Sequence, residues 1–255
     1  MADLSGRRIL ITRAPEDAAR LAALVRARGG VPLVFPCLER APPEDLEPLD
    51  RLWAERDRFD RFVVGSPHAL TPFGGFPEPS RRVPVACVGP KTAAAVEASP
   101  ELSARFTVAE VAADRRAEGL AAALKASLGA KDGLRGRAFA FPRAAEGREA
   151  LVGLLEAEGA TVEAVVSYRL RLGDLASAEA LEAVASADVL TFLSGRTLEG
   201  FLARTGPRGR GFLERAVVAV IGPVAKARAA ELGVRVDVVP EKASAEALLD
   251  ALAAL

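Results

Sequence analysis

The sequence contains very few of the residues that build metal and disulfide sites. Its 255 residues include two cysteines, Cys37 and Cys87, and one histidine, His68. A single histidine and two thiols far apart in the sequence cannot form a zinc cluster, which needs several nitrogen or sulfur ligands. Two cysteines are also too few for the disulfide framework of a small secreted domain. These counts exclude both kinds of site.

An excess of charge and long hydrophobic runs are missing as well. The 34 lysines and arginines balance 34 aspartates and glutamates, so nothing indicates a general attraction to nucleic acid. No apolar stretch is long enough to span a bilayer, and the first residues, MADLSGRRIL, do not resemble a signal peptide. We therefore expect a globular protein of the cytoplasm that has neither nucleic acid nor membrane as a partner.

What the chain does contain is a series of strand–turn–helix segments. In VACVGPKTAAAV (residues 85–96), a partly β-branched run ends at Gly89-Pro90, and a helix-forming stretch follows. Such a turn leaves unpaired N–H groups at the start of a helix, which favours anion binding. It is not a P-loop, because the longer glycine loop ending in Gly-Lys-Ser/Thr is absent.

These segments form a repeat. The stretch that begins RRILITRAPEDAARLAALVRARGG at Arg7 has the same pattern as GRAFAFPRAAEGREALVGLLEAEGA, and the matched positions lie 130 residues apart without a gap. Both copies predict a strand, a turn bearing arginine, and an amphipathic helix closed by glycine. The matched pairs are Arg13 with Arg143, Glu16 with Glu146, Leu21 with Leu151, Leu24 with Leu154, and Gly29 with Gly159.

Three further pairs of segments follow in the same order. RFVVGSPHALTPF resembles DVLTFLSGRTLEGF, VACVGPKTAAAV resembles VAVIGPVAKARA, and FTVAEVAADRRAEGLAAAL resembles VRVDVVPEKASAEALLDAL. They match Ser66 with Ser194, Gly89 with Gly222, and Leu120 with Leu248. Chance similarity between alanine-rich segments is a poor explanation for four matches in one order, so we infer an internal duplication.

Strands that alternate with helices predict two lobes with parallel sheets and right-handed crossovers. In such open sheets a ligand sits on the turns at the carboxyl ends of the strands. Here these turns carry small residues, hydroxyls and cations, for example Thr12-Arg13, Gly65-Ser66 and Pro142-Arg143. Two lobes with matching rims of N–H donors and positive charge are expected to close on a polyanion.

The chain resembles the uroporphyrinogen-III synthase family over essentially its whole length. The resemblance rests on the order and spacing of RILITRA, VVGSPHAL, VGPKTAAAV, GREALVGLLEAEGATVEAVVSYR and VAVIGPVAKARAAELGVRVDVVPEKASAEALLDAL. It implies an α/β fold of two Rossmann- or flavodoxin-like lobes joined by a two-stranded connector. Lobe 1 would comprise residues 1–35 and 171–255, lobe 2 residues 41–165, and the connector strands residues 36–40 and 166–170. Periodicity alone also allows a tandem split near residue 130.

The resemblance also implies an activity. Members of the family are lyases that cyclise hydroxymethylbilane, an open chain of four pyrroles bearing eight carboxylates, to uroporphyrinogen III, with loss of water and inversion of ring D. By this resemblance the chain would need no metal and no cofactor, would bind a tetrapyrrole in the biosynthesis of haem, sirohaem or cobalamin, and would be a monomer. A handover of substrate from hydroxymethylbilane synthase fits this picture.

The resemblance and the turn positions together define a set of site residues. Tyr168, the only tyrosine, matches a family tyrosine on the connector, where its phenol could donate a proton to the departing hydroxyl; a tyrosine packed on the lobes is the structural alternative. The substrate-binding residues that we expect are Thr12, Arg13, Ser66, Pro67, His68, Ala69, Gly89, Lys91, Thr92, Arg143, Arg148, Ser194, Gly195, Arg196, Gly222, Val224 and Ala225.

Some of these positions depart from the family or have an alternative role. The Thr92 hydroxyl is expected to cap its helix, a role compatible with a ligand contact. Val224 and Ala225 replace threonine in the second copy, so that only backbone N–H groups would remain there. His68 stands where the family more often has asparagine, and we expect it to bond a carboxylate or face solvent. Trp53 is expected in the core rather than as a stacking platform.

Two other classes of protein remain open on the residues alone. A two-lobed glycosyltransferase would bind a nucleotide sugar, but such enzymes are usually longer, and no GxGxxG motif or convincing ribose-binding acid is present. A two-lobed solute-binding protein shares the hinged design, although most such proteins are exported. Binding of nucleotide sugars, porphyrinogens or small solutes would distinguish the three classes.

Overall fold

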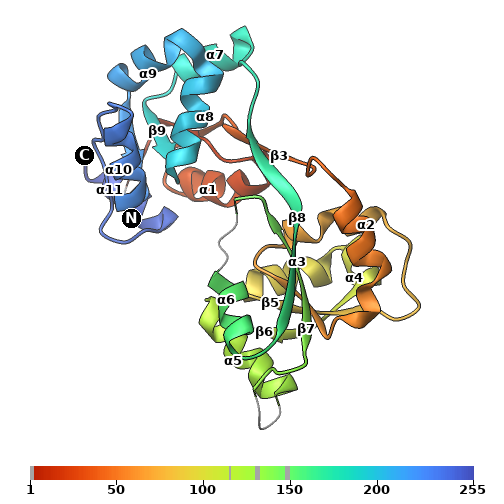
Figure 1. Ribbon diagram of the computed structural model, residues 1–255. Helices are drawn as coiled ribbons and strands as arrows, with labels where there is room; N and C mark the ends of the chain where they lie inside the picture. Colours follow the sequence, from red (N-terminus) through yellow and green to blue (C-terminus); the bar gives the residue numbers. More distant parts are fainter. Residues whose placement is uncertain (1–2, 115, 130–132, 147–149) are drawn as a thin grey trace. The chain divides into compact units, whose positions relative to one another are not determined.

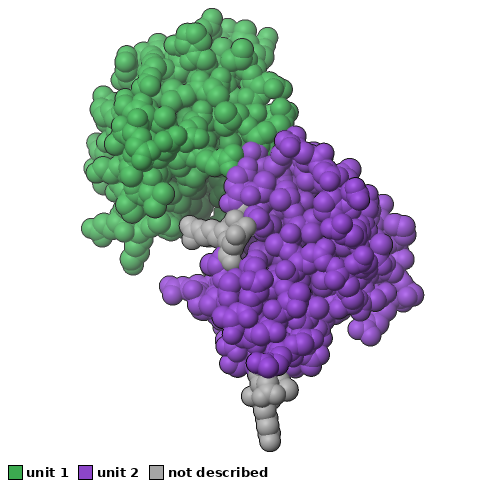
Figure 2. Space-filling model, viewed as in Figure 1, with its two compact units in different colours: residues 1–39, 171–255 green, residues 40–170 purple. Residues whose placement is uncertain are grey.

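The chain folds into two compact units, which we describe separately. The computed structural model describes residues 3–114, 116–129, 133–146 and 150–255 (Figure 1). Unit 1 consists of residues 1–39 and 171–255, and unit 2 of residues 40–170 (Figure 2). The chain therefore passes from one unit to the other twice, next to or within the segments 36–40 and 166–170. Arg148 lies outside the described residues.

Unit 1 is built on a parallel sheet of four strands in the order β10-β9-β1-β2. Because successive side chains of a strand point to opposite faces, the sheet has a core on each side. Helices α7–α10 cover one face, where Leu10 and Phe192 are buried, and helices α1 and α11 cover the other, where Ile9 and Ile11 are buried. The elements are β1 (Arg8–Ile11), α1 (Pro15–Ala27), β2 (Val31–Val34), α7 (Ala178–Ala185), β9 (Val189–Phe192), α8 (Gly195–Thr205), η4 (Gly206–Arg208), α9 (Gly209–Arg215), β10 (Val217–Val220), α10 (Pro223–Glu231) and α11 (Ala245–Ala253).

Unit 2 contains a sheet of six strands in the order β3-β8-β7-β4-β5-β6, and the five from β8 to β6 run parallel. Helices α2–α4 pack on one face and α5–α6 on the other. Trp53 is buried among phenylalanines, 5.6 Å from the ring of Phe106, which confirms its expected place in the core. The elements are β3 (Leu38–Ala41), α2 (Glu47–Ala54), η1 (Arg56–Arg58), β4 (Arg61–Val64), η2 (Pro67–Ala69), η3 (Thr71–Gly75), β5 (Val83–Cys87), α3 (Pro90–Ala98), α4 (Pro100–Arg105), β6 (Phe106–Val111), α5 (Ala117–Leu128), β7 (Ala138–Ala144), α6 (Ala150–Ala157) and β8 (Thr161–Leu172).

The duplication is visible in the strand pairing. The order β10-β9-β1-β2 of unit 1 corresponds to β5-β4-β7-β8 of unit 2. Arg8 of β1 pairs with Val31 of β2, and Ala138 of β7 pairs with Thr161 of β8. The two strand pairs therefore have the same register, with each residue number shifted by 130. The isolated bridge of Ala219 with Val238 likewise corresponds to the pairing of Ala86 with Glu110. The duplicated sequence thus encodes one topology twice.

An aspartate clamp recurs in both units. The Oδ2 atom of Asp188 accepts the backbone N–H of Arg8 at 2.7 Å, and that of Asp60 accepts the N–H of Ala138 at 2.9 Å. In return, the N–H groups of Asp188 and Asp60 donate to the carbonyls of Arg8 and Ala138, at 2.9 and 2.8 Å. The clamp therefore fixes β9 beside β1 in unit 1 and β4 beside β7 in unit 2, at the amino ends of the strands.

The helix-closing glycines generate a first prediction. Gly29 and Gly159, after α1 and α6, have φ of +77° and +88°, where a Cβ atom costs roughly 1–2 kcal/mol. We expect Gly159→Ala to lower the free energy of unfolding by at least about 1 kcal/mol. Gly153→Ala, inside α6 with open space around the new Cβ, should instead raise it by about 0.5–1 kcal/mol. Urea unfolding measures both free-energy changes. If the two substitutions changed the free energy of unfolding in the same direction, the helix-closing role of Gly159 would be contradicted.

The aspartate clamp generates a prediction about pH. The hydrogen bonds from the Arg8 side chain and N–H hold the pKa of Asp188 below its ordinary value. A lowered folded-state pKa stabilises the protein above the unfolded-state pKa of about 3.9, and the effect is lost as the pH falls through the folded-state pKa. Because the carboxylate is 43% exposed, we expect Asp188→Asn to cost only about 1 kcal/mol at pH 7.

Unfolding of wild type and Asp188→Asn should be compared between pH 7 and pH 2, with Asp57→Asn as the control. Asp57 is exposed and makes no hydrogen bond or ion pair with the rest of the described chain. The cost of Asp188→Asn should disappear toward pH 2, while the control stays near zero throughout. A cost that persisted unchanged at pH 2 would show that the carboxylate charge does not contribute.

Candidate functional site

The candidate site of unit 2 lies where the strand order reverses. After β4 the chain continues to β5 and β6 on one side, and then returns to β7 and β8 on the other. The carboxyl ends of β4 and β7 therefore form a topological switch point, the usual ligand position in open α/β sheets. A cavity of about 510 Å³ lies at this point, and Gly65 after β4 and Pro142 at the end of β7 both line it.

The cavity brings several predicted residues together. Ser66, Ala69, Arg143 and Tyr168 all contribute to its lining. The Nη1 atom of Arg143 donates to the carbonyls of Ala144 and Ala145, at 3.1 and 3.3 Å, which anchors the guanidinium at the end of β7. The other predicted residues of unit 2 that the structure describes, Pro67, His68, Gly89, Lys91 and Thr92, lie on the same carboxyl-end turns but outside the lining.

A β-bulge positions Tyr168. The pairing of β7 with β8 shifts after Arg143, so that Ala144 pairs with Tyr168 and Ser167 is the extra residue. The Ser167 hydroxyl donates to the Arg143 carbonyl at 3.2 Å, and the Tyr168 carbonyl accepts the N–H of Ala145 at 2.9 Å. Bulges of this kind re-aim a side chain next to a functional site. The bulge brings the phenol ring, which is partly exposed, to the cavity.

His68 and Tyr168 lie side by side, which the sequence did not predict. Their ring centroids are 6.4 Å apart in an edge-on arrangement. The imidazole comes from the turn after β4 and the phenol from the connector strand, so the tertiary fold alone joins them. Arg116 and Glu118 also line the cavity and were missed. Their signal was present, because Arg116 is the N-cap of α5 and Glu118 lies in its first turn, both within the last repeated segment.

Several predicted binding hydroxyls instead stabilise the turns. Thr12 is fully buried, and its Oγ1 donates to the carbonyl of Thr191 at 2.8 Å. Thr92 does not cap α3, as the sequence had suggested, because its Oγ1 donates to the carbonyl of Gly65 at 3.4 Å. Thr12 thereby links the ends of β1 and β9, and Thr92 links the turns after β5 and β4. The structure uses both hydroxyls to hold the fold.

The two repeated serines are N-caps. The Oγ of Ser194 accepts the N–H of Thr197 at 3.3 Å, and the Thr197 hydroxyl accepts the N–H of Ser194 in return, which completes a capping box on α8. The Oγ of Ser66 accepts the N–H of His68 at 3.4 Å, at the start of a three-residue turn. Each cap uses the hydroxyl oxygen as an acceptor, so the O–H remains able to donate to a ligand.

In unit 1 the predicted residues follow the ends of three strands. Arg13 comes after β1, Ser194, Gly195 and Arg196 after β9, and Gly222, Val224 and Ala225 after β10. Val224 is 82% exposed, whereas Ala225 is buried in the core of unit 1. The Ala225 side chain therefore packs inward at the first turn of α10, in keeping with the expectation that a binding role here would fall to the backbone. Only its backbone N–H could contribute to binding.

The glycines at the two Gly-Pro turns have extended backbones. Gly89 has φ −165° and Gly222 has φ 176°, conformations open to any residue. A Cβ atom on Gly222 would lie 3.5 Å from that of Ala243, which is ordinary contact. The backbone conformation therefore does not require glycine at either position, and at Gly222 there is also room for a Cβ atom. What glycine does provide there is close access to the N–H groups at the helix start.

The described residues offer no metal centre. Within them, no group of three or more histidine, cysteine, aspartate or glutamate side chains could hold a metal ion. Across the same part of the chain, no helix is both long and apolar enough to cross a membrane. What the site does provide is a phenol, an imidazole, guanidinium groups and main-chain N–H donors. Such a set can bind carboxylates and move a proton.

The caps generate a prediction that separates folding from binding. Removing the Ser194 hydroxyl breaks a capping box on an eleven-residue helix, so Ser194→Ala should lower the free energy of unfolding by about 1 kcal/mol. Ser66→Ala should cost only a few tenths of a kcal/mol, because its longer bond caps a single short turn. Ser194→Gly is the control, since glycine is a tolerated N-cap and should recover most of the loss. Equal costs for the two alanine variants in urea unfolding would contradict the distinction.

The sequence and the fold of this chain both resemble those of known proteins. A sequence profile of the family described as uroporphyrinogen-III synthase HemD matches residues 19–250. A uroporphyrinogen-III synthase from Synechococcus elongatus is 28% identical to this chain, and the alignment covers 98% of this chain and 95% of the relative's length. A putative uroporphyrinogen-III synthase from Methanothermobacter thermautotrophicus is 36% identical to this chain, and the alignment covers 95% of this chain and 96% of the relative's length.

A solved structure shares the fold. The uroporphyrinogen-III synthetase from Helicobacter pylori superposes with a TM-score of 0.59 and covers 96% of this chain and 97% of its own. At 17% sequence identity, this likeness concerns the fold alone. It supports the two-unit α/β architecture derived above from the strand order.

Proposed function

The chain belongs to the uroporphyrinogen-III synthase family, and we propose that its carboxyl-end rims hold the acetate and propionate groups of hydroxymethylbilane during cyclisation. The family activity is that of a lyase that closes a linear tetrapyrrole with loss of water. The match over residues 19–250 does not favour the glycosyltransferase or the solute-binding alternative. Membership of the family does not show which residues of this chain bind the substrate and which assist the reaction.

Backbone groups provide much of the proposed binding. The helices that begin after Gly89 and Gly222 present unpaired N–H groups, and glycine leaves them open to a carboxylate. Arg13, Arg143 and Arg196, on the turns after β1, β7 and β9, add positive charge. Because Thr12 and Thr92 bond backbone carbonyls, they preserve the shape of the turns. The substrate carboxylates are thus met by main chain and arginine.

One observation carries the catalytic part of the proposal. Tyr168, Ser66 and Arg143 line one cavity at the switch point of unit 2. In the family reaction, loss of the hydroxyl from ring A creates an electrophile, which must couple at the substituted carbon of ring D. Tyr168 would donate a proton to the departing hydroxyl, while Arg143 binds a carboxylate and holds the chain in the folded conformation. The folded conformation of the bound substrate thus determines which isomer forms, and the proton from Tyr168 assists the loss of the hydroxyl group.

The two thiols do not act as nucleophiles in this proposal. Burial raises the pKa of Cys87 to about 12 and also raises the pKa of Cys37. Both thiols therefore stay protonated at neutral pH, and a protonated thiol is a weak nucleophile. Both cysteines are free and buried, which suits a reducing compartment and supports a cytoplasmic location as part of the proposal.

The proposal is tested with hydroxymethylbilane, followed by oxidation of the product and separation of isomers I and III. Arg143→Gln should raise KM roughly tenfold with little change in kcat, because one charge-assisted contact to a carboxylate is lost. Arg135→Gln is the matched control, since Arg135 is exposed before β7, at the opposite end of the strand, and should change neither constant. Tyr168→Phe should lower kcat by about tenfold or more, with KM nearly unchanged.

The assay can also contradict the proposal. If the wild-type chain gives only the isomer I that forms without enzyme, the activity is absent. If Tyr168→Phe retains the full kcat, the phenol is not the proton donor. If Arg143→Gln and Arg135→Gln behave alike, position on the rim does not matter. Each variant is first checked by thermal unfolding, so that a folding defect is not mistaken for a binding defect.

A further inference from the structure

Helices α5 of unit 2 and α11 of unit 1 are copies of one element, but they begin in different ways. Ser244 is the N-cap of α11, and its Oγ accepts the N–H of Ala247 at 3.1 Å. In the repeat that matches Leu120 with Leu248, the counterpart of Ser244 is Arg116, the N-cap of α5. An arginine side chain has no acceptor atom and cannot cap a helix. Unit 2 therefore has a guanidinium where unit 1 has a stabilising cap.

An ion pair of unit 1 is missing at the same place in unit 2. Glu246, in the first turn of α11, pairs with Arg20 of α1 at 2.6 Å. The counterparts in unit 2 are Glu118, in the first turn of α5, and Ala150, at the start of α6. Alanine cannot take the place of the arginine. Across the described part of the chain, no residue forms a hydrogen bond or ion pair with the Glu118 carboxylate.

Further from the helix starts, both units keep an ion pair. Arg28, after α1, pairs with Asp250 of α11 at 2.8 Å. Its counterpart Glu158, after α6, pairs with Lys125 of α5 at 2.7 Å. Each helix pair is therefore still joined at this end. The change at the helix starts of unit 2 is a local one, and not a general loss of contacts.

The altered positions all line the cavity at the switch point. Arg116, Glu118 and Ala150 contribute to its wall, together with Arg143 and Tyr168. Like the Glu118 carboxylate, the guanidinium of Arg116 makes no hydrogen bond or ion pair with any described residue. In unit 1 the cap and the ion pair occupy the matching groups. Unit 2 thus lacks these local bonds at the wall of its candidate site.

The main chain of Arg116 is held, although its side chain is unpaired. Its N–H donates to the Oδ1 atom of Asp114 at 3.0 Å. The Asp114 carboxylate lies so close to Gly119 that no Cβ atom would fit there. These contacts fix the turn at the cavity without using the guanidinium, which stays available to a ligand.

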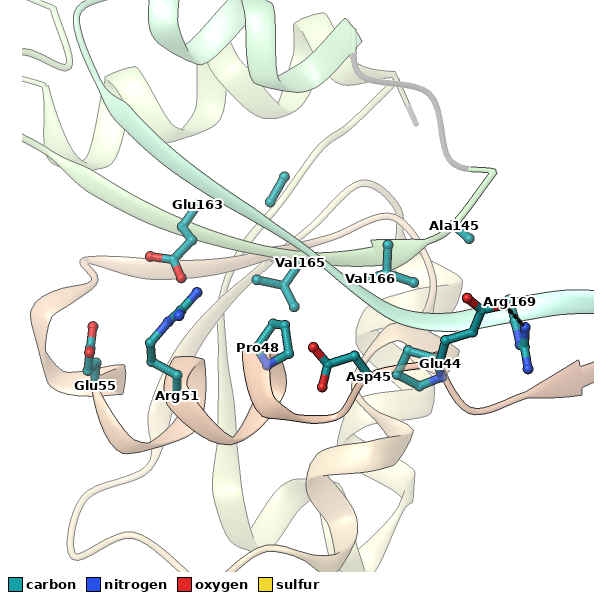
Figure 3. Close-up of a pocket in the computed structure, with 12 residues that line it drawn as sticks. Glu44, Asp45, Pro48, Arg51, Glu55, Ala145, Glu163, Val165, Val166 and Arg169 are labelled. Atoms are coloured by element: carbon teal, nitrogen blue, oxygen red, sulfur yellow. Dashed lines mark hydrogen bonds and ion pairs between the residues drawn. The ribbon is translucent and has the colours of Figure 1, made fainter.

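A larger groove in unit 2 has the opposite balance of charge. It measures about 900 Å³ and lies between β8 and α2 (Figure 3). Its described lining contains four carboxylates and two guanidinium groups, which belong to Glu44, Asp45, Glu55, Glu163, Arg51 and Arg169. Such a surface repels a substrate that is rich in carboxylates. The cavity at the switch point instead sets Arg116 and Arg143 against Glu118.

The polar groups of the cavity match one pyrrole ring of hydroxymethylbilane. Each ring carries two carboxylates on one side and an N–H group on the other. Arg116 and Arg143 can each bind a carboxylate. The ionised carboxylate of Glu118 can only accept hydrogen bonds, so it requires a donor of the substrate such as the pyrrole N–H. A wall with arginines alone would bind carboxylates only, whereas this wall can also bind the ring nitrogen.

We propose that Glu118 is a further catalytic residue, which accepts the N–H of ring A and stabilises the positive charge that forms on this ring. Arg116 binds a carboxylate of the same ring. Glu118 has this role only if the function proposed above is correct, with Tyr168 as the proton donor to the departing hydroxyl. The hydroxyl and the N–H of ring A are only a few bonds apart. The residues that contact them must therefore line one cavity, as Tyr168 and Glu118 do.

The charge on ring A arises when its C–O bond breaks. The electron pair of this bond leaves with the oxygen, which takes the proton of Tyr168 and departs as water. Ring A keeps a positive charge that its nitrogen shares, and a carboxylate at the N–H stabilises this charge more than it stabilises the neutral ring. The new bond to ring D then neutralises ring A. Ring D finally loses a proton, which restores the phenol of Tyr168.

The first test compares Glu118→Gln with Glu246→Gln in the assay that separates isomers I and III. Both substitutions remove a carboxylate from the first turn of a helix, but of the two residues only Glu118 lines the cavity. Because the charge forms only in the transition state, Glu118→Gln should lower kcat about tenfold with little change in KM. Glu246→Gln should lose the ion pair with Arg20 and some resistance to urea, with both kinetic constants unchanged.

Two further variants transfer features of unit 1 to unit 2. Arg116→Ser supplies a cap like that of Ser244, so it should raise the urea concentration at the midpoint of unfolding. It should also raise KM about tenfold, because a contact to a carboxylate is lost. Ala150→Arg supplies a partner for Glu118 and should lower kcat about tenfold more than Ala150→Gln, which adds bulk without charge. These variants test the role of the cavity wall even if Glu118→Gln folds poorly.

The outcomes separate the role of Glu118 from the proposed function as a whole. If the wild type forms isomer III and Glu118→Gln keeps the full kcat, Glu118 is not catalytic. An equal loss of kcat in Glu118→Gln and Glu246→Gln would show that the charge acts through its helix and not on the substrate. An unchanged KM in Arg116→Ser would show that no carboxylate binds there. If the wild type forms only isomer I, the proposed function itself is wrong, and the role of Glu118 falls with it.

Discussion

The aspartate clamp is the interaction on which the candidate site depends. In each unit one carboxylate accepts the first N–H of the neighbouring strand, and the aspartate N–H donates back to the carbonyl of the same residue. The strands so joined, β9 with β1 and β4 with β7, are the two that flank the reversal of strand order. Because a parallel register set at one end persists to the other, the clamp determines which turns meet at the carboxyl end.

Much of this architecture was predictable from the sequence, and the reason is the repeat. The offset that matches Arg13 with Arg143 is the offset between the registers Arg8–Val31 and Ala138–Thr161. The closing glycines, Gly29 and Gly159, also hold positive φ as expected. Periodicity alone, however, did not distinguish a tandem split from an interrupted first unit, because the same local pattern serves both. That choice rests on strand pairing between residues far apart in the chain.

The site was predictable in position but not in side-chain role. Turn chemistry placed Ser66 and Arg143 on the carboxyl-end turns, since ligands of open parallel sheets sit there, whereas Tyr168 was assigned from the family resemblance. Turn chemistry did not show that Thr92 bonds Gly65 or that Ala225 enters the core, because side-chain direction depends on the tertiary environment. The bulge at Ser167 left no signal in the sequence, although it aims Tyr168. Hydroxyls that look available in a sequence are readily taken up by backbone carbonyls.

The interruption of unit 1 by unit 2 has a consequence for synthesis on the ribosome. The segment with β1, α1 and β2 leaves the ribosome first, yet β9, the neighbour of β1, lies beyond residues 40–170. At translation rates of roughly 5–20 residues per second, the apolar strand Arg8–Ile11 therefore waits on the order of ten seconds for its partner. Unit 2 can complete its sheet within that interval. The nascent chain thus carries a folded inner domain while core residues of the outer one, such as Ile9 and Leu10, still lack the partners that bury them, which makes the amino-terminal segment the natural client for a chaperone.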